Sequence, residues 1–161
     1  MQFQPENFRF EESLGYLVGK LRGLMQLALE EEVADLGISA AQAIVLMRIQ
    51  LYPGLPAAKL CRFSGYDTGA MTRMLDKLED KGLVARQRSA ADRRVVELEL
   101  TVAGSELCAR LPERFCRIGN VLMEDMDPEE VATLKGLLRR TLDKAEQAFA
   151  RQVAQSEGET E

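Results

Sequence analysis

The stretch from Ser64 to Thr101 constrains the fold of this chain more than any other part of the sequence. It opens with a glycine-containing turn and an amphipathic helical run that ends just before Gly82, a residue typical of the position after a helix. A short strand is expected over residues 83–88, and a basic loop then leads into residues 95–100, where apolar and polar side chains alternate as in a half-buried strand. The sequence therefore predicts the order turn, helix, strand, charged loop and strand.

The helical run in this stretch has one apolar and one polar face. Asp67 is a strong N-cap residue, and apolar side chains follow it at helical intervals, at Met71, Met74, Leu75 and Leu78. The four residues 63–66 before it match, in length and composition, the turn that joins the two helices of a helix-turn-helix. Together with the two strands that follow, this arrangement predicts a winged helix-turn-helix.

Two shorter helices are expected before the turn. Ser39 and Gln42 form a capping-box pattern that opens the first of them. Pro56 stands where the first turn of a helix tolerates proline, so a second short helix is expected from there to about Arg62. Because two strands alone are marginally stable, the hairpin must pack against these helices, and residues 39–101 are interpreted as one module.

Long helices are expected on both sides of this module, over residues 11–36 and 102–150. Their apolar positions fall at helical intervals and cover more surface than one small module can bury. A closed two-fold dimer would bury that surface, so both ranges are interpreted as dimerisation helices; a monomer with a larger bundle core is the alternative. Residues 152–161 are polar and acidic, and a disordered tail is expected there. The expected fold class is mainly α with a small β-hairpin, a winged helix-turn-helix flanked by N- and C-terminal dimerisation helices.

The charge of the chain is unevenly distributed. The net charge is −5, but residues 55–101 hold nine basic and seven acidic side chains, so this segment is +2 and the remainder is −7. An acidic body that carries a mildly basic module fits a protein that contacts phosphate groups at one face only.

Neither catalytic nor metal chemistry is expected. The chain has no histidine, which removes the commonest general base and metal ligand, and it has no glycine-rich phosphate loop or nucleophile motif. Its three cysteines, Cys61, Cys108 and Cys116, have no C-x-x-C spacing, so no zinc site or other cofactor is expected, and they suit a reducing compartment. Residues 1–12 lack the features of a signal peptide, and no stretch is apolar enough to cross a membrane, which predicts a cytoplasmic protein.

The polar face of the helical run is a candidate DNA-contacting surface. A recognition helix presents short side chains and a few long donors at its N-terminal end, because that end enters the major groove. Thr68, Gly69 and Thr72 keep the surface low, Arg73 can fork onto guanine or phosphate, and Lys77 is placed for phosphate. The alternative for this helix alone is an ordinary solvated face.

The basic loop between the two strands strengthens the DNA-binding interpretation. Its charged residues are Arg88, Asp92, Arg93 and Arg94, and an arginine at a protruding tip can enter a minor groove. Asp92 can orient a neighbouring arginine through a charge-assisted hydrogen bond. The alternative is a hairpin tip that only increases solubility.

These segments resemble a known family. The run Asp92-Arg93-Arg94 through Leu100-Thr101-Val102-Ala103-Gly104 is similar to the wing signature of the MarR family of bacterial transcriptional regulators, and so is the segment from Thr72 to Val84. The resemblance implies a homodimer whose two winged modules bind a double-stranded, pseudo-palindromic operator. It also implies repression that is relieved by a small, often aromatic or phenolic, ligand or by cysteine oxidation. By the family pattern Arg94 reaches the minor groove and Asp92 supports it.

The candidate effector contacts are two arginines. Arg22 and Arg48 lie in mostly apolar helical stretches and could meet a carboxylate or phenolate; the alternative is that each extends to solvent or pairs with an acidic side chain. Family members that sense peroxides usually have a reactive cysteine near the N-terminus, and this chain has none before Cys61. A cysteine-redox-responsive repressor and a winged-helix protein-interaction module without DNA binding remain as alternative interpretations.

Overall fold

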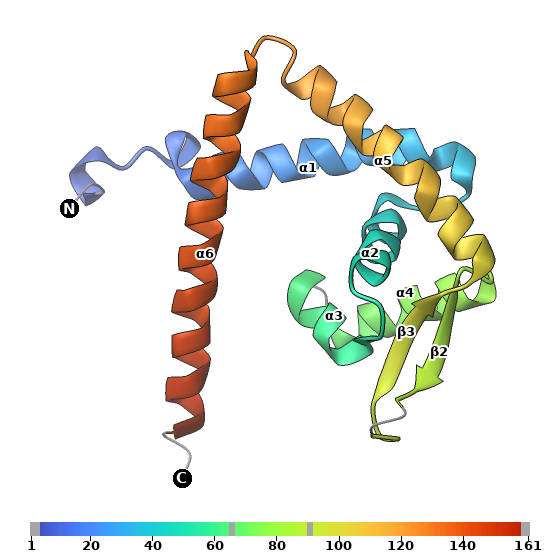
Figure 1. Ribbon diagram of the computed structural model, residues 1–161. Coiled ribbons are helices and arrows are strands. Elements are labelled where there is room, and N and C mark those ends of the chain that lie inside the picture. Colours follow the sequence, from blue (N-terminus) through green and yellow to red (C-terminus); the bar gives the residue numbers. More distant parts are fainter. Residues whose placement is uncertain (1–3, 65–66, 90–91, 159–161) are drawn as a thin grey trace. The chain divides into compact units, whose positions relative to one another are not determined.

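The computed structural model describes residues 4–64, 67–89 and 92–158, and it divides into two compact units, residues 1–118 and 119–161, which are treated separately below. The elements follow one another along the chain in the order shown in Figure 1: η1 (Pro5–Asn7), η2 (Phe10–Glu12), α1 (Leu14–Val33), η3 (Ala34–Leu36), α2 (Ala40–Leu51), β1 (Leu55–Pro56), α3 (Ala57–Ser64), α4 (Thr68–Asp80), β2 (Val84–Arg88), β3 (Val96–Leu100), α5 (Val102–Leu122) and α6 (Pro128–Gly158). The mainly helical fold class with a small antiparallel sheet is therefore confirmed.

Helix α2 begins at the predicted capping box. The Ser39 hydroxyl accepts the N–H of Gln42, and the Gln42 side-chain oxygen accepts the N–H of Ser39. A second side chain supports the same end, because Glu30 of α1 accepts the N–H of Ala40 at 2.7 Å. These bonds satisfy the free N–H groups at the start of α2 and fix the corner between α1 and α2.

Helix α4, the predicted recognition helix, begins at its predicted cap. An oxygen of Asp67 accepts the N–H of Ala70 at 2.8 Å. The apolar face is packed into the protein, where Met71, Leu75 and Leu78 are buried. The preceding helix, α3, extends to Ser64, two residues beyond its predicted end, and part of the predicted turn, residues 65–66, lies outside the described residues.

The end of α4 is also the predicted one. Gly82 adopts a φ of +67°, a left-handed conformation that glycine tolerates without cost. Its N–H donates to Glu79 at 2.8 Å, and the N–H of Leu83 donates to Leu78 at 2.9 Å. This pair of bonds is a Schellman motif, and the buried side chains of Leu78 and Leu83 complete it. The connection from α4 to β2 is therefore short and tightly bonded.

The predicted hairpin is formed by β2 and β3. The strands pair antiparallel from Val84 opposite Leu100 to Arg88 opposite Val96. The predicted alternation is confirmed where Leu98 is fully buried and Glu99, the next residue, is exposed. One face of the hairpin therefore packs on the helices.

The described residues contain a third strand that the sequence analysis did not predict. The short strand β1 pairs with β3, through Leu55 opposite Leu98 and Pro56 opposite Glu97, and gives the sheet order β1-β3-β2. Pro56 was assigned to the first helical turn, but α3 begins at Ala57. Proline lacks an N–H and is tolerated in an edge strand, which is the position that β1 occupies.

The hairpin is joined to α5 by a compact junction. The Thr101 hydroxyl donates to the carbonyl of Gly82 at 2.6 Å and accepts the N–H of Gly104 at 3.0 Å. Thr101 thus caps α5 and ties the start of that helix to the end of α4. This junction is formed by residues 100–104, whose sequence is Leu-Thr-Val-Ala-Gly.

One core unites α1 to α5. Its largest fully buried side chains come from every one of these helices and from β3: Val33, Val45, Leu46, Ile49, Leu60, Met71, Leu78, Leu98, Cys108 and Leu111. Because the hairpin contributes Leu98 to this core, the sheet is held by side-chain packing as well as by its hydrogen bonds.

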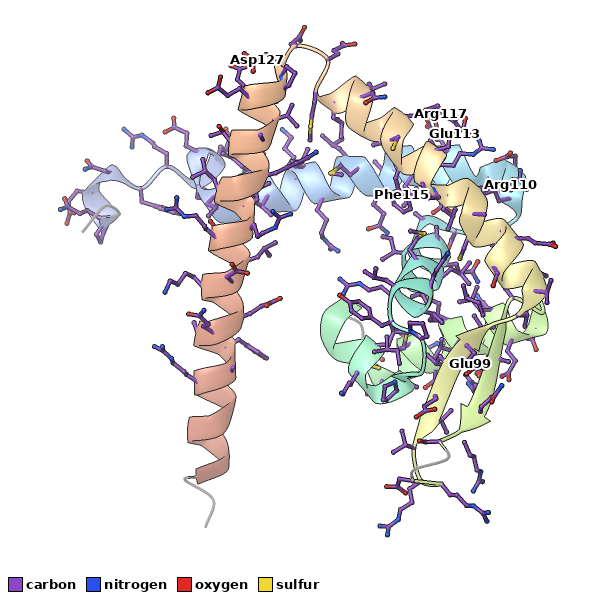
Figure 2. The ribbon with its side chains drawn as sticks, in the orientation of Figure 1. Glu99, Arg110, Glu113, Phe115, Arg117 and Asp127 are labelled. Carbon is purple, nitrogen blue, oxygen red and sulfur yellow. The ribbon has the colours of Figure 1, made fainter. Side chains whose placement is uncertain are left out.

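A group of ion pairs links the end of α1 to the middle of α5. Arg117 Nε donates to Glu32 at 3.0 Å, and Arg114 Nη2 donates to Asp35 at 2.7 Å. Arg117 also pairs with Glu113 one turn away on α5 (Figure 2). The hydrogen bond that Arg117 donates to Glu32 raises the pKa of Arg117 above its usual value. These contacts hold the end of α1 and the following turn, η3, against α5.

The first helix leaves much apolar surface uncovered. Along α1 the exposed apolar side chains are Leu14, Leu17, Val18, Leu21, Leu24, Met25 and Leu27. No helix in the described part of the chain combines the length and the hydropathy that crossing a bilayer requires.

Helix α6, which belongs to the second unit, starts at a capping box, in which Asp127 accepts the N–H of Glu130 and Glu130 accepts the N–H of Asp127. It also leaves apolar side chains exposed, at Leu137, Leu142 and Phe149. The expectation of a disordered tail from residue 152 is wrong for residues 152–158, because α6 continues to Gly158. That segment contains good helix formers and no proline, so nothing in it ends the helix before glycine. Residues 159–161 lie outside the described residues.

Candidate nucleic-acid interface

The exposed face of α4 carries the five residues that the sequence analysis selected. Thr68, Gly69, Thr72, Arg73 and Lys77 are all exposed. The Thr72 hydroxyl donates to the carbonyl of Thr68 at 2.8 Å, which leaves its oxygen able to accept a hydrogen bond. This half of the helix surface is therefore low and polar, as close approach to another polar surface requires.

The cations on this face have no partner within the described residues. Neither Arg73 nor Lys77 forms a side-chain hydrogen bond or ion pair there. A Cβ added to Gly69 would stand 3.4 Å from Arg73 Nη1, so the arginine lies back along the start of the helix. Glycine at position 69 gives the guanidinium room to lie there.

The wing, residues 84–100, presents the other predicted cations. Arg88 and Arg93 are exposed, and the Arg94 side chain is 96% exposed. Asp92 accepts the main-chain N–H of Arg94 at 3.0 Å, and its carboxylate lies 3.9 Å from Arg94 Nε. Asp92 thus shapes the turn that displays Arg94. Residues 90–91 of this loop lie outside the described residues.

One residue of this region was missed by the sequence analysis. Arg86 of β2 is half-buried and reaches α4, where Nη2 lies 2.6 Å from Asp76 and Nη1 lies 3.1 Å from Glu79. Its position two residues after buried Val84 places it on the helix-facing side of the strand. That spacing was the available signal, but it does not specify which acidic residues the side chain meets.

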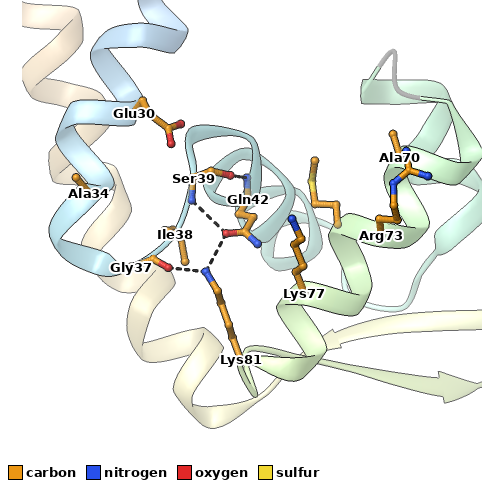
Figure 3. A pocket seen from close by; sticks show the side chains of 11 residues that line it. Glu30, Ala34, Gly37, Ile38, Ser39, Gln42, Ala70, Arg73, Lys77 and Lys81 are labelled. Atoms are coloured by element: carbon orange, nitrogen blue, oxygen red, sulfur yellow. Dashed lines mark hydrogen bonds between the residues drawn. The ribbon is translucent and has the colours of Figure 1, made fainter.

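A hollow of about 590 Å³ lies beside α4, between it and the corner of α1 and α2 (Figure 3). Arg73, Lys77 and Lys81 line it from α4, and Glu30 and Gln42 line it from the other side. Lys81 is engaged, because its ammonium donates to the carbonyl of Gly37 and to the side-chain oxygen of Gln42. Lys81 therefore ties the end of α4 to the α1–α2 corner.

The two effector candidates lie in different surroundings. Arg48 of α2 lines an apolar hollow of about 320 Å³ together with Ile44, Met47, Leu51 and Phe115. Arg22 is exposed on α1. Arg48 thus has the apolar surroundings that a small aromatic anion would require.

The cysteines differ in exposure. Burial raises the pKa of the Cys108 thiol to about 11, so that thiol is poorly suited to reaction at neutral pH. Cys116 is exposed and Cys61 is half-buried. In the described part of the chain, no group of three or more acidic or cysteine side chains is arranged to hold a metal ion.

The sequence and the fold both match known proteins. The MarR family model matches residues 38–96. The multiple antibiotic resistance protein MarR of Escherichia coli (strain K12) is 33% identical over 130 residues, which cover 80% of this chain and 90% of that protein. The crystal structure of wild-type E. coli MarR in its apo form has a TM-score of 0.73, covering 81% of this chain and 97% of that one. A mutant E. coli MarR crystallised with operator DNA has a TM-score of 0.73 at 32% identity, covering 84% and 99% of the two chains.

Proposed function

Because this chain belongs to the MarR family of transcriptional regulators, we propose that it is a homodimeric repressor that binds a pseudo-palindromic operator and leaves it when a small ligand binds. The observation that carries this proposal is the set of exposed cations on α4 and the wing. Arg73, Lys77, Arg88 and Arg93 have no ion-pair partner within the described residues, although the chain as a whole is acidic. A similar protein has been crystallised with operator DNA, which supports a DNA partner for this chain.

The proposed contacts divide between two grooves. Thr68, Gly69, Thr72 and Arg73 at the N-terminal half of α4 would face base edges in the major groove, and Lys77 would bind a phosphate. The wing would reach the adjacent minor groove through Arg94, with Arg88 and Arg93 near the backbone and Asp92 holding the turn. Since residues 55–101 carry a charge of only +2, specific placement must contribute much of the affinity.

The proposed dimer rests on the terminal helices, residues 11–36 and 102–150. Seven large apolar side chains are exposed along α1 and three along α6, and exposed apolar side chains gathered on one helix mark an interaction patch. A second copy would bury the same patch on both chains, as two-fold symmetry requires. Two copies of residues 39–101 would then meet successive major grooves, about 34 Å apart.

The proposed effector site is the hollow lined by Arg48. Its walls are Ile44, Met47, Leu51 and Phe115, and the arginine offers a guanidinium for a carboxylate or phenolate. Because Phe115 comes from α5 and Arg48 from α2, a ligand there would contact both a proposed dimerisation helix and the DNA-binding module. Arg22, exposed on α1, remains the second candidate.

The test is selection of duplexes from a random-sequence pool by the purified chain, followed by fluorescence anisotropy of the selected duplex. We expect an inverted repeat with half-sites one helical turn apart, and sedimentation of the free protein as a dimer at micromolar concentration. Failure to enrich any sequence would favour a protein-interaction module instead. Adding phenolic acids to the complex tests the effector, which should lower the affinity in the unaltered chain and much less in an Arg48→Met variant.

A further inference from the structure

The geometry points to Arg86 as a positioning residue that sets the wing against the recognition helix, so that one module reads two grooves at once. This inference rests on the proposed DNA-binding function. The side chain lies on β2 and its partners lie on α4, so it bridges the two elements that would contact DNA. Arg86 itself is half-buried and pairs with two carboxylates of α4, and it is not a DNA contact in this proposal.

The bonds of Arg86 form a three-point attachment to one face of α4. Nη2 donates to Asp76 at 2.6 Å and lies 3.5 Å from the carbonyl of Thr72, while Nη1 lies 3.1 Å from Glu79. Asp76 and Glu79 are separated by three residues, so their carboxylates stand one turn apart on the same side of the helix. A planar guanidinium held at three points fixes direction as well as distance, which a lysine ammonium cannot do.

The attachment lies part of the way along the hairpin, where it can limit rotation of the hairpin about its base. The strand is already fixed at its base, where the Schellman motif and Val84 hold it to the core. Arg86 is the next residue on the same face, and beyond it Arg88 is exposed. A small rotation of the hairpin about its base would therefore displace Arg94 at the far end. Arg86 on β2 opposes such a rotation together with buried Leu98, which lies opposite it on β3.

The charges of the partners permit a decisive test. Asp76→Asn with Glu79→Gln removes two negative charges from the recognition helix, which by charge alone should strengthen binding to any duplex. Loss of wing position should instead weaken the selected operator relative to unrelated DNA. The measured quantity is the ratio of the two dissociation constants, for the selected duplex and for a mixed-sequence duplex of equal length.

We expect the double variant to bind the mixed-sequence duplex more tightly, and its preference for the selected duplex to fall about tenfold, the effect of one mismatched base pair. Arg86→Met should lower the same preference. Arg94→Ala should then reduce the affinity for the selected duplex much less in either background than in the unaltered chain, because a displaced wing has already lost most of the Arg94 contact. Gln87→Met is the matched control: Gln87 lies on the opposite face of β2 and bonds Glu99 within the hairpin, so its loss should leave the preference unchanged.

Two results would overturn the inference: an operator preference that is kept or increased in the Asp76→Asn, Glu79→Gln variant, or an Arg94→Ala effect that is equal in all backgrounds. The double variant retains Arg86, and its neutral partners can still accept hydrogen bonds, so it should fold. The operator preference can therefore be measured in it even if Arg86→Met does not fold. If the unaltered chain selects no sequence, the proposed function fails and not the role of Arg86.

Discussion

Gly104 at the start of α5 lies directly against the main-chain carbonyl of Leu83: a Cβ built on Gly104 would stand 2.0 Å from that oxygen. The same oxygen accepts the N–H of Thr101 at 3.1 Å, so it cannot move away without breaking that bond. Gly104 is buried, and its neighbour here is backbone. Helix α5, which follows the wing, therefore packs directly against the connection between α4 and β2, at a distance that only glycine allows.

Gly104→Ala should lower the free energy of unfolding by about 2–3 kcal/mol, because the added methyl group would force α5 away from the main chain of Leu83. Urea denaturation measures this difference. Gly119→Ala on the same helix is the control, since nothing lies within 4 Å of a Cβ there and alanine favours a helix by up to about 1 kcal/mol. Equal effects of the two substitutions would show that the close approach does not matter to stability.

The sequence predicted the elements of the module because their signals are short-range. The caps Ser39 and Asp67 act over three residues, and the apolar periods of α4 and β3 extend over a few turns or pairs. The short strand β1 was missed because it has two residues, and its pairing partner lies about forty positions later in the chain. Local sequence patterns cannot predict a contact between residues that lie so far apart in the chain.

The candidate site shows the same limit. The exposed cations of α4 were found because a helix presents its polar face to solvent. Lys77 and Lys81 look alike in the sequence, yet Lys77 has no bond within the described residues and Lys81 donates to Gly37 and Gln42. Arg86 likewise required knowledge of how the strand faces the helix. Which of several like charges is engaged depends on tertiary contacts.

The two lysines should separate stability from DNA binding. Lys81→Met removes the donor to the Gly37 carbonyl and should lower the free energy of unfolding by about 1 kcal/mol. Lys77→Met should leave unfolding unchanged and weaken binding to the selected duplex, and the slope of log K against log salt should fall by about one. Denaturation and anisotropy at several salt concentrations measure both. A stability loss in Lys77→Met, or none in Lys81→Met, would contradict the assignment.

Cys108 should make stability fall at alkaline pH. Burial raises its pKa from 9.0 to about 11, so above pH 9 the thiol of the unfolded chain loses its proton while the folded one keeps it. The contribution of this thiol is fully present below pH 9 and is lost as the pH rises toward 11. Relative to a Cys108→Ala variant, the unaltered chain should lose stability across this range. A difference in urea midpoint that stays constant from pH 8 to pH 11 would argue against a buried, neutral thiol.

Arg94 should contribute to binding on every DNA sequence. Its side chain is almost fully exposed and Asp92 holds the turn beneath it, so Arg94→Ala removes a cation without disturbing the core. Binding should weaken on selected and mixed-sequence duplexes alike. The log–log salt slope should fall by about one for a phosphate contact, and by less for a contact within the minor groove. Arg110→Ala is the control for charge, because Arg110 is an exposed arginine on α5, 58% accessible, and lies outside the proposed interface. If both variants bind as the unaltered chain does, the wing does not contact DNA; if both weaken it equally, only net charge matters.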